Sequence, residues 1–469
     1  MKADVGVDTL KPTPWPGVVM VLAGVGVVLL ANRIAALPDA RGVLSEYLTL
    51  WTAWFICLAS GAWAIRRVAV PSALVWLLAV AVASRLCLIL MPASLSDDWV
   101  RYLWDGRLVV HGWDPYAAVP TDPVLIGMND DFLLSGMNSP DYFTVYPPVS
   151  QGVFAFSWWV GGGDAARAFV AMRCVFAAFD ALACVLLVAW LRSLRIDPRW
   201  AVWYAWSPIA VVELVGGVHS EALLAAPLIG CLLAIRLKRD VLAGGLLAVA
   251  VWVKLFPILA VIPLALRVGR RRAIRAGVTC LVVGLLIGWP MLRPKAASNV
   301  LDSLGLYAGV FSFNHGPFEL LWSGWGAVAS GFRGSPYEDA TRMLLLALGV
   351  WVVWQYWRSR SLQGDVDADR KLAGVLAAIF GGYMLANANV HPWSLAWVLP
   401  LVPALGVRWI AAWTWFSLWA GYSYLAYDRE PIGAPAWVLG FEWGGFTLLA
   451  AWAWRGRRAL HAKRPSTAT

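Results

Sequence analysis

The sequence predicts an all-α, polytopic membrane protein, and three observations lead to this fold class. Of the 469 residues, 60% are hydrophobic and 14% are charged, whereas a soluble domain carries about 25% charged residues. Long apolar runs recur along the chain, many near the length of about 20 residues that crosses a bilayer. The 31 Trp are more than a soluble core uses, and indole rings favour the headgroup level of a membrane.

Each sufficiently long apolar run is predicted to be a membrane helix. Together the runs predict a bundle of about 11–14 spanning helices, forming one integral-membrane domain over residues 1–469. Lys254 and Pro257 interrupt the run 241–266, which is predicted to form two short limbs that meet near the lysine. The predicted spans are 17–36, 46–65, 70–91, 165–191, 200–218, 221–236, 241–266, 273–290, 340–357, 372–388, 392–406, 410–427 and 435–455.

Short basic loops predict the orientation of the chain, because Lys and Arg are enriched in cytoplasmic loops. Counting spans from these loops places the polar segments 92–150 and 291–339 together on the opposite, extracytoplasmic face. The net charge of +10 therefore reflects topology, and we expect no nucleic-acid partner. The basic segments are 66–67, 192–199, 236–239, 267–275, 358–371 and the tail 456–469.

The segment 92–150 carries two adjacent acids directly after a predicted span. Apolar residues after Asp97 and Asp98 recur at roughly helical spacing, which predicts an amphipathic helix lying on the membrane surface. The acids could simply cap and stabilise the start of this helix. Their position beside Arg101 and Arg107, at the mouth of an apolar bundle, favours a chemical role instead.

Further polar residues fall on the same face. His219 and Glu221 join two predicted spans, and Lys254 lies inside one, where an ionisable side chain is costly to keep. An interfacial turn would explain the first two without a function, and snorkelling to the surface would explain the lysine. The convergence of these groups with the acid pair favours a single site.

Acids and cations on one face suit attack by a hydroxyl group on a sugar that is activated by a lipid phosphate. Asp98 would accept the hydroxyl proton, with Asp97 positioning the acceptor or sharing that role. Arg101, Lys254 and His391 would neutralise the departing phosphate. The predicted substrate-binding residues are Arg101, Tyr102, Arg107, Tyr146, His219, Glu221, Lys254, Asn314, His315 and His391.

The chain lacks motifs for a cofactor. No Gly-rich nucleotide loop follows a predicted strand, and no HExxH spacing is present. The six Cys lie in apolar segments without CxxC spacing, which predicts free thiols and neither a disulfide framework nor a zinc site. We expect no metal and no cofactor, since side chains alone can neutralise one phosphate.

Four motifs resemble the C-type (GT-C) integral-membrane glycosyltransferases: DWVRYLWDGRLVVHGWDPY from Asp98, YPP at Tyr146, KLFP at Lys254 and HPW at His391. They are most similar to bacterial polyprenyl-phosphate-mannose-type enzymes of glycosyltransferase family 87 and its relatives, including the first mannosyltransferase of the glycosylphosphatidylinositol pathway. The resemblance implies a GT-C bundle, an inverting reaction without a catalytic metal, and a base in the first external loop, where Asp98 matches best. In that family the loop usually follows the first membrane helix, whereas three predicted spans precede it here.

The expected function is transfer of a single sugar from a polyprenyl-phosphate donor to a lipid or glycan acceptor. Mannose is the first expectation for the sugar, with arabinose, glucose and galactose open. We expect a monomer in a bacterial inner membrane, with the site on the extracytoplasmic face and membrane lipids around it. Two alternatives remain, a lipid-linked glycan polymerase or ligase and a transporter or flippase. No inverted repeat, typical of transporters, is visible.

Overall fold

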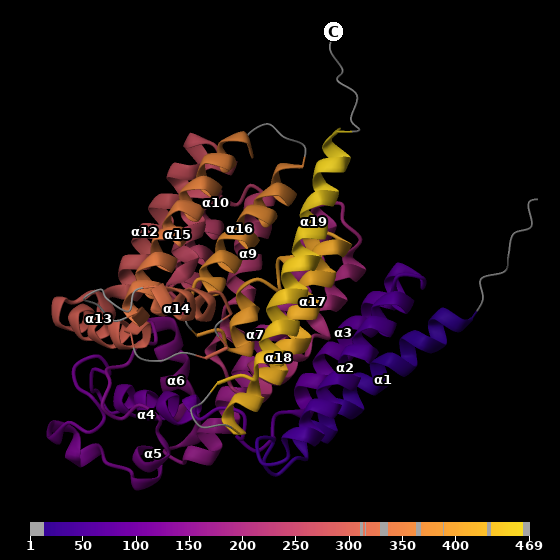
Figure 1. Ribbon diagram of the computed structural model, residues 1–469. Helices are drawn as coiled ribbons and strands as arrows, with labels where there is room; N and C mark the ends of the chain where they lie inside the picture. The colour runs from indigo at the N-terminus through magenta and orange to yellow at the C-terminus, as the bar shows by residue number, and fades with distance from the viewer. Residues whose placement is uncertain are drawn as a thin grey trace, which may run out of the picture.

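A computed structural model describes residues 14–309, 313–314, 316–328, 336–362, 367–387, 389–428 and 433–462. Within these residues every regular element is a helix, apart from one isolated bridge between Phe313 and Asn389. The all-α fold class is therefore confirmed. The long helices pack side by side as a bundle (Figure 1).

Three long helices precede the polar insert: α1 (Trp15–Ala35), α2 (Leu44–Ile65) and α3 (Val70–Cys87). Each is long and apolar enough to cross a membrane, as are α7 (Ala165–Ser193) and α12 (Arg270–Leu292). The first three predicted spans are thus confirmed as helices, and the insert follows the third helix among the described residues. Five described helices meet this criterion, or six with one bent pair counted as a single span.

Several predicted spans are broken into short pieces, which is why fewer helices meet the criterion than the sequence predicts. The prediction of one helix over 200–218 was wrong, because the segment forms short turns and a π-helix, and the next limb bends away by 114°. Residues 392–406 likewise form only two 3-10 turns. Both segments are almost entirely buried in protein, and hydropathy does not distinguish that environment from lipid. The pieces are η2 (Pro198–Ala201), α8 (Val202–Ala205), η3 (Ile209–Gly216), η4 (Ser220–Leu223), α9 (Ala225–Arg236), η7 (Pro392–Trp397) and η8 (Val402–Ala404).

The run 241–266 forms the two limbs that the sequence predicts. The first is α10 (Asp240–Val253), and the second continues from η5 (Phe256–Ala260) into α11 (Val261–Val268). Lys254 lies between them with φ −147° and ψ 137°, an extended conformation that ends the helix. Trp252 Nε1 donates to the Gly284 carbonyl at 2.7 Å and so ties α10 to α12.

The insert folds into α4 (Asp98–Val110), η1 (Pro123–Met128), α5 (Asp131–Gly136) and α6 (Pro148–Gly161). The helix predicted after the acid pair is present as α4, and nearly all of its first three turns are buried in the protein. This burial comes from close packing on α6, since a Cβ on Gly106 would lie 2.4 Å from the Phe154 carbonyl oxygen. Gly112, at φ +80°, follows the end of the helix, where glycine tolerates a left-handed backbone.

The remaining helices form the second half of the bundle. Four of them coincide with predicted spans at 340–357, 372–388, 410–427 and 435–455. Two short helices, α13 and α14, lie in the second predicted external segment. The bounds are α13 (Pro294–Gly309), α14 (Gly316–Val328), α15 (Pro336–Ser359), η6 (Arg360–Leu362), α16 (Ala368–Leu385), α17 (Val407–Tyr422), η9 (Ser423–Asp428), α18 (Ala436–Leu439), η10 (Gly440–Gly444) and α19 (Gly445–Ala462).

The basic loops meet at one end of the bundle. Arg236 and Arg267 both pair with Asp369, at 3.3 Å and 2.9 Å, and Arg272 pairs with Asp240 at 2.7 Å. In Figure 1, α4 and α5 lie at the lower end of the bundle, and the last turns of α19 lie at the upper end. The acid-bearing insert and the basic C-terminal helix therefore occupy opposite ends.

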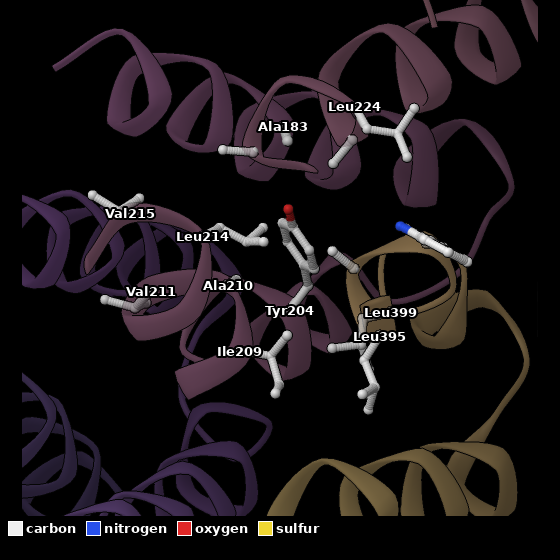
Figure 2. Close-up of a cluster of buried hydrophobic side chains, with 14 of the residues drawn as sticks. Ala183, Tyr204, Ile209, Ala210, Val211, Leu214, Val215, Leu224, Leu395 and Leu399 are labelled. Carbon is white, nitrogen blue, oxygen red and sulfur yellow. The ribbon is translucent and has the colours of Figure 1, made fainter. Parts of the chain in front are cut away.

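Every residue of the π-helix η3 is buried. Figure 2 shows Tyr204 surrounded by side chains of η3, such as Leu214, and by Leu395 and Leu399, which lie in η7 and just after it. The Tyr204 hydroxyl donates to Asp180, whose carboxylate also pairs with Arg85 at 2.5 Å. This buried network joins α3, α7 and α8, so the broken helices are held in a fixed arrangement.

Candidate functional site

The two acids lie at the start of α4, but neither side chain caps the helix. The Ser96 hydroxyl accepts the hydrogen bond from the Asp98 backbone N–H at 3.2 Å, while Asp97 makes no capping bond. Instead, Asn138 Nδ2 donates to both carboxylates, at 3.2 Å to Asp97 and 3.1 Å to Asp98. Capping by the acids themselves is therefore not the explanation for the pair. Asp97 is exposed and Asp98 is half-buried.

Burial raises the pKa of Asp98 above that of an ordinary carboxyl group. The hydrogen bond from Asn138 opposes this rise, the neighbouring Asp97 adds to it, and more distant Lys254 and Glu221 respectively lower and raise the pKa. Loss of hydration is the largest cause, because it disfavours the charged form. Asp98 thus has the environment of a proton acceptor, and it lies within electrostatic range of the cation that the sequence predicts in the same site.

Lys254 and Glu221, which lie at two separate breaks between helices, form an ion pair at this end of the bundle. Lys254, at the end of α10, places its Nζ 2.9 Å from Oε1 of Glu221 on η4. The glutamate side chain is 2% exposed and the lysine side chain 25% exposed. Lys254 is therefore held by a buried carboxylate, and snorkelling does not describe it. Because its side chain is partly exposed, it can also contact an anion that enters the site.

Tyrosine rings form a wall beside the ion pair. Lys254 Nζ lies 5.5 Å from the ring centroid of Tyr146, a cation–π distance. The Tyr146 ring packs edge-on against Tyr102 at 4.7 Å, and Tyr102 stacks on Phe154 at 4.4 Å. Tyr116 donates its hydroxyl to the Tyr146 carbonyl at 2.8 Å. Both predicted tyrosines thus lie at the site, on a wall fixed by α4 and α6.

Four parallel rings form a second wall. Phe313 stacks on His391 at 4.4 Å, His391 on Trp393 at 4.2 Å, and Trp393 on His219 at 3.7 Å. His219 is fully buried, and neither of its ring nitrogens has a hydrogen-bond partner among the described residues. Buried polar atoms normally have partners. The imidazole is therefore available to a water molecule or to a ligand hydroxyl group.

Three residues at the site were not among those the sequence analysis selected. Arg41 lies 3.9 Å from Asp97 and 4.8 Å from the ring centroid of Tyr427. Asn138 bridges the two acids. Arg41 could have been found from its place in a loop on the predicted external face. Asn138 and Tyr427 have no sequence signal, because only the tertiary fold brings them to α4.

Two of the predicted substrate-binding residues, Arg101 and Arg107, form ion pairs within the insert. Arg101 is buried and pairs with Asp105 at 2.8 Å while donating to the carbonyls of Ser139 and Tyr142. Arg107 pairs with Asp130 at 2.7 Å. These contacts hold the loop around α4.

Two predicted substrate-binding residues, Asn314 and His315, belong to the second external segment. Asn314, which has a positive φ of 50°, donates to Glu442 at 3.0 Å and to the Val390 carbonyl at 3.3 Å. It therefore ties the segment next to Phe313 to η10. His315 lies outside the described residues.

The structure also bears on the predicted cysteine and metal chemistry. All six Cys are free thiols, as predicted. Among the described residues, no group of three or more His, Cys, Asp or Glu side chains is arranged to hold a metal ion.

Together these features define a polytopic helical membrane protein with acids, a lysine and stacked aromatic rings gathered at one end of the bundle. Comparison with known proteins gives the family. The chain belongs to the family described as alpha-(1->6)-mannopyranosyltransferase, N-terminal domain, whose profile matches residues 17–270. The matched part runs from α1 to the end of α11 and contains Asp98, Glu221 and Lys254, so the resemblance to mannosyltransferases is confirmed.

One curated relative shares a shorter region. Alpha-(1->6)-mannopyranosyltransferase A of Corynebacterium glutamicum is 28% identical over 172 residues, which are 36% of this chain and 34% of that protein. The alignment thus spans about a third of the relative's length. No solved structure matches the chain.

Proposed function

We propose that this protein transfers a mannosyl residue from a polyprenyl-phosphate donor to a hydroxyl group of a lipid or glycan acceptor. The observation that carries the proposal is that Asp98, at the start of α4, lies within electrostatic range of the Lys254–Glu221 ion pair. A carboxylate with a raised pKa and a solvent-accessible cation are the two groups that such a transfer needs. Membership of a family named for α-(1→6)-mannosyl transfer supports the choice of sugar and linkage.

In the proposed reaction Asp98 accepts the proton of the acceptor hydroxyl group. The hydroxyl oxygen then attacks the anomeric carbon of the donor, and the bond from that carbon to the phosphate oxygen breaks. The electron pair leaves with the polyprenyl phosphate. A single displacement inverts the anomeric centre, so an α-linked product requires a β-linked donor.

Lys254 stabilises the charge that develops on the departing phosphate. Glu221 holds the ammonium group in place, and the Tyr146 ring supports it from the side. His219 contacts a sugar hydroxyl group, which would satisfy one of its ring nitrogens. We assign Arg101 and Arg107 to the support of the loop, because each already pairs with a carboxylate.

The proposed site faces the extracytoplasmic side of a bacterial inner membrane. The support is the separation of charge along the bundle. The basic loops meet at the end opposite α4, and basic loops favour the cytoplasm. A lipid-linked donor suits that location, since the sequence shows no Gly-rich nucleotide loop after a predicted strand.

The test of the proposal is Asp98→Asn in membranes supplied with radiolabelled polyprenyl-phosphate mannose and an alkyl mannoside. Loss of a general base lowers the rate by about 100- to 10,000-fold. The matched control is Asp131→Asn, an exposed acid in the same insert, which should keep wild-type transfer. Wild-type activity of Asp98→Asn, in protein that is inserted and monodisperse, would overturn the assignment of the base.

A further inference from the structure

One buried arginine lacks the carboxylate partner that buried cations normally have. Arg173, in the third turn of α7, is fully buried, and no described acid forms an ion pair with it. Among the described residues, Arg85 and Arg101 are also buried, and each of them pairs with an aspartate. A buried charge without a countercharge is costly to keep, so the contacts of Arg173 indicate what the charge is used for.

The guanidinium group of Arg173 joins two segments of the chain through their backbone carbonyls. Its Nη1 donates to Ile89 at 3.2 Å and to Met91, and its Nη2 donates to Gly216 at 2.7 Å. Ile89 and Met91 follow the end of α3, and Gly216 is the last residue of η3. Carbonyl groups at helix ends are left without helical partners and carry partial negative charge. These carbonyls therefore take the place of a carboxylate.

Both segments lead directly into the candidate site. The chain from Met91 continues to Asp98 at the start of α4. The chain from Gly216 continues to Glu221, which pairs with Lys254 at 2.9 Å. One side chain thus connects the segment that carries the proposed base with the segment that holds the proposed phosphate-binding lysine.

The backbone near Arg173 shows that these two segments are closely fitted. A Cβ on Gly216 would lie 3.1 Å from the Met91 sulfur, so the segments approach each other directly. Val218 has a φ of 58°, in the left-handed region that β-branched residues rarely adopt. Such a conformation persists where surrounding contacts fix it. The bond from Arg173 to Gly216 is one such contact, two residues before the valine.

We propose that Arg173 is a positioning residue that sets the spacing between Asp98 and the Glu221–Lys254 pair. The inference rests on the proposed function, in which these groups act on opposite sides of one bond between sugar and phosphate. Arg173 acts through the two backbone segments and contacts neither substrate. Its bonds matter because a displacement of about 1 Å in a reacting site can lower the rate about 100-fold.

The test begins with Arg173→Lys, which keeps the buried positive charge. A lysine ammonium is a compact point charge and does not reproduce the planar fork that reaches carbonyls on two segments. We expect kcat/KM for polyprenyl-phosphate mannose to fall about tenfold, a partial loss relative to the 100-fold limit, in protein that is inserted and monodisperse. The matched control is Arg167→Lys, which changes an exposed arginine of the same helix and should keep the wild-type value.

A double-mutant cycle separates positioning from a general effect on the fold. Arg173→Lys is repeated in protein that already carries Lys254→Met. Residues that act through one another give non-additive effects, so Arg173→Lys should lower kcat/KM less than about threefold once the lysine that it helps to place is absent. The same tenfold fall in both backgrounds would overturn the proposal, as would a wild-type value for Arg173→Lys.

Arg173→Gln keeps the test decisive if the lysine variant does not fold. The neutral amide leaves no charge buried without a partner, and it should lower kcat/KM at least as much as Arg173→Lys. Loss of monodisperse protein in both variants would assign Arg173 to stability alone and would also overturn the proposal. Absence of transfer by the wild-type protein would instead contradict the proposed function.

Discussion

Two clusters of buried charge in this bundle differ in how completely their polar atoms are satisfied. In the first, Arg85 and Asp180 are 1% and 0% exposed, and the guanidinium also donates to the carbonyls of Ala81 and Ala205. In the second, Asp98 is only half-buried and His219 has two ring nitrogens without partners among the described residues. Buried charged groups that are fully paired hold helices together, whereas polar groups without a full set of partners are typical of a ligand-binding site.

The largest effect on activity is expected for Asp98→Asn, which should lower the transfer rate about 100- to 10,000-fold. Wild-type transfer by this variant would contradict the distinction between the two clusters most directly. The same variant should leave folding unaffected. Burial already disfavours the Asp98 carboxylate, so a neutral amide removes that cost.

Arg85→Ala should have the opposite pattern. It leaves the Asp180 carboxylate buried without its cationic partner, which costs about 3–5 kcal/mol of folding free energy. We expect a lower thermal stability in detergent and less monodisperse protein by size-exclusion chromatography. Asp98→Asn serves as the comparison in the same assays, and equal destabilisation by the two variants would contradict the distinction between the clusters.

Lys254→Met tests the cationic half of the second cluster. A charge-assisted contact to the phosphate contributes about 1.5–3 kcal/mol, so kcat/KM for the donor should fall about 10- to 100-fold. Lys254→Arg should recover part of the loss because it restores the positive charge. The control is Lys295→Met, which removes an exposed lysine of α13. A similar loss in that variant would point to general surface charge.

The pH profile sharpens the assignment of the base. A base acts when deprotonated, so transfer is present above the pKa of Asp98 and is lost as the pH falls through it. Because burial raises this pKa, the acid limb of kcat/KM should lie above the value of about 3.9 for an ordinary aspartate. Asp97→Asn removes a charge that raises the pKa and should move the limb to lower pH. Asn138→Ala removes a hydrogen bond that lowers it and should move the limb to higher pH. Shifts in the reverse directions would exclude Asp98.

Chelation should have the smallest effect. The proposed mechanism neutralises the phosphate with Lys254, so treatment of the purified protein with a chelator should change the rate by less than about twofold, a difference well under the 1.4 kcal/mol that corresponds to tenfold. Loss of activity that a divalent cation restores would mean that Asp97 and Asp98 hold a metal ion instead.

Local sequence signals predicted the long helices and the break at Lys254. The three helices before the insert are continuous apolar runs, and the pair formed by Lys254 and Pro257 marks the break at the correct residue. The segments 200–218 and 392–406 were misread because their apolar side chains face protein. Nothing in a hydropathy pattern specifies whether the neighbour of a leucine is another helix or a lipid chain.

Residues of the candidate site could be selected from the sequence where an ionisable side chain interrupts an apolar run, because such a side chain is costly to bury. The selection was less successful where a charged residue has an ion-pair partner in the same helix. Asp98, His219 and Glu221 are polar residues at the ends of apolar runs, and Lys254 lies inside one. All four belong to the candidate site. Arg101 was assigned to the phosphate, although Asp105 follows it at the i+4 spacing that favours an ion pair within one helix.

The column of four stacked rings has a mechanical consequence. Phe313 belongs to the second external segment, while His219 belongs to the break that also carries Glu221. Flat rings at 3.7 to 4.4 Å are in contact and resist compression. Through these ring contacts the column links the second external segment directly to the break that carries Glu221.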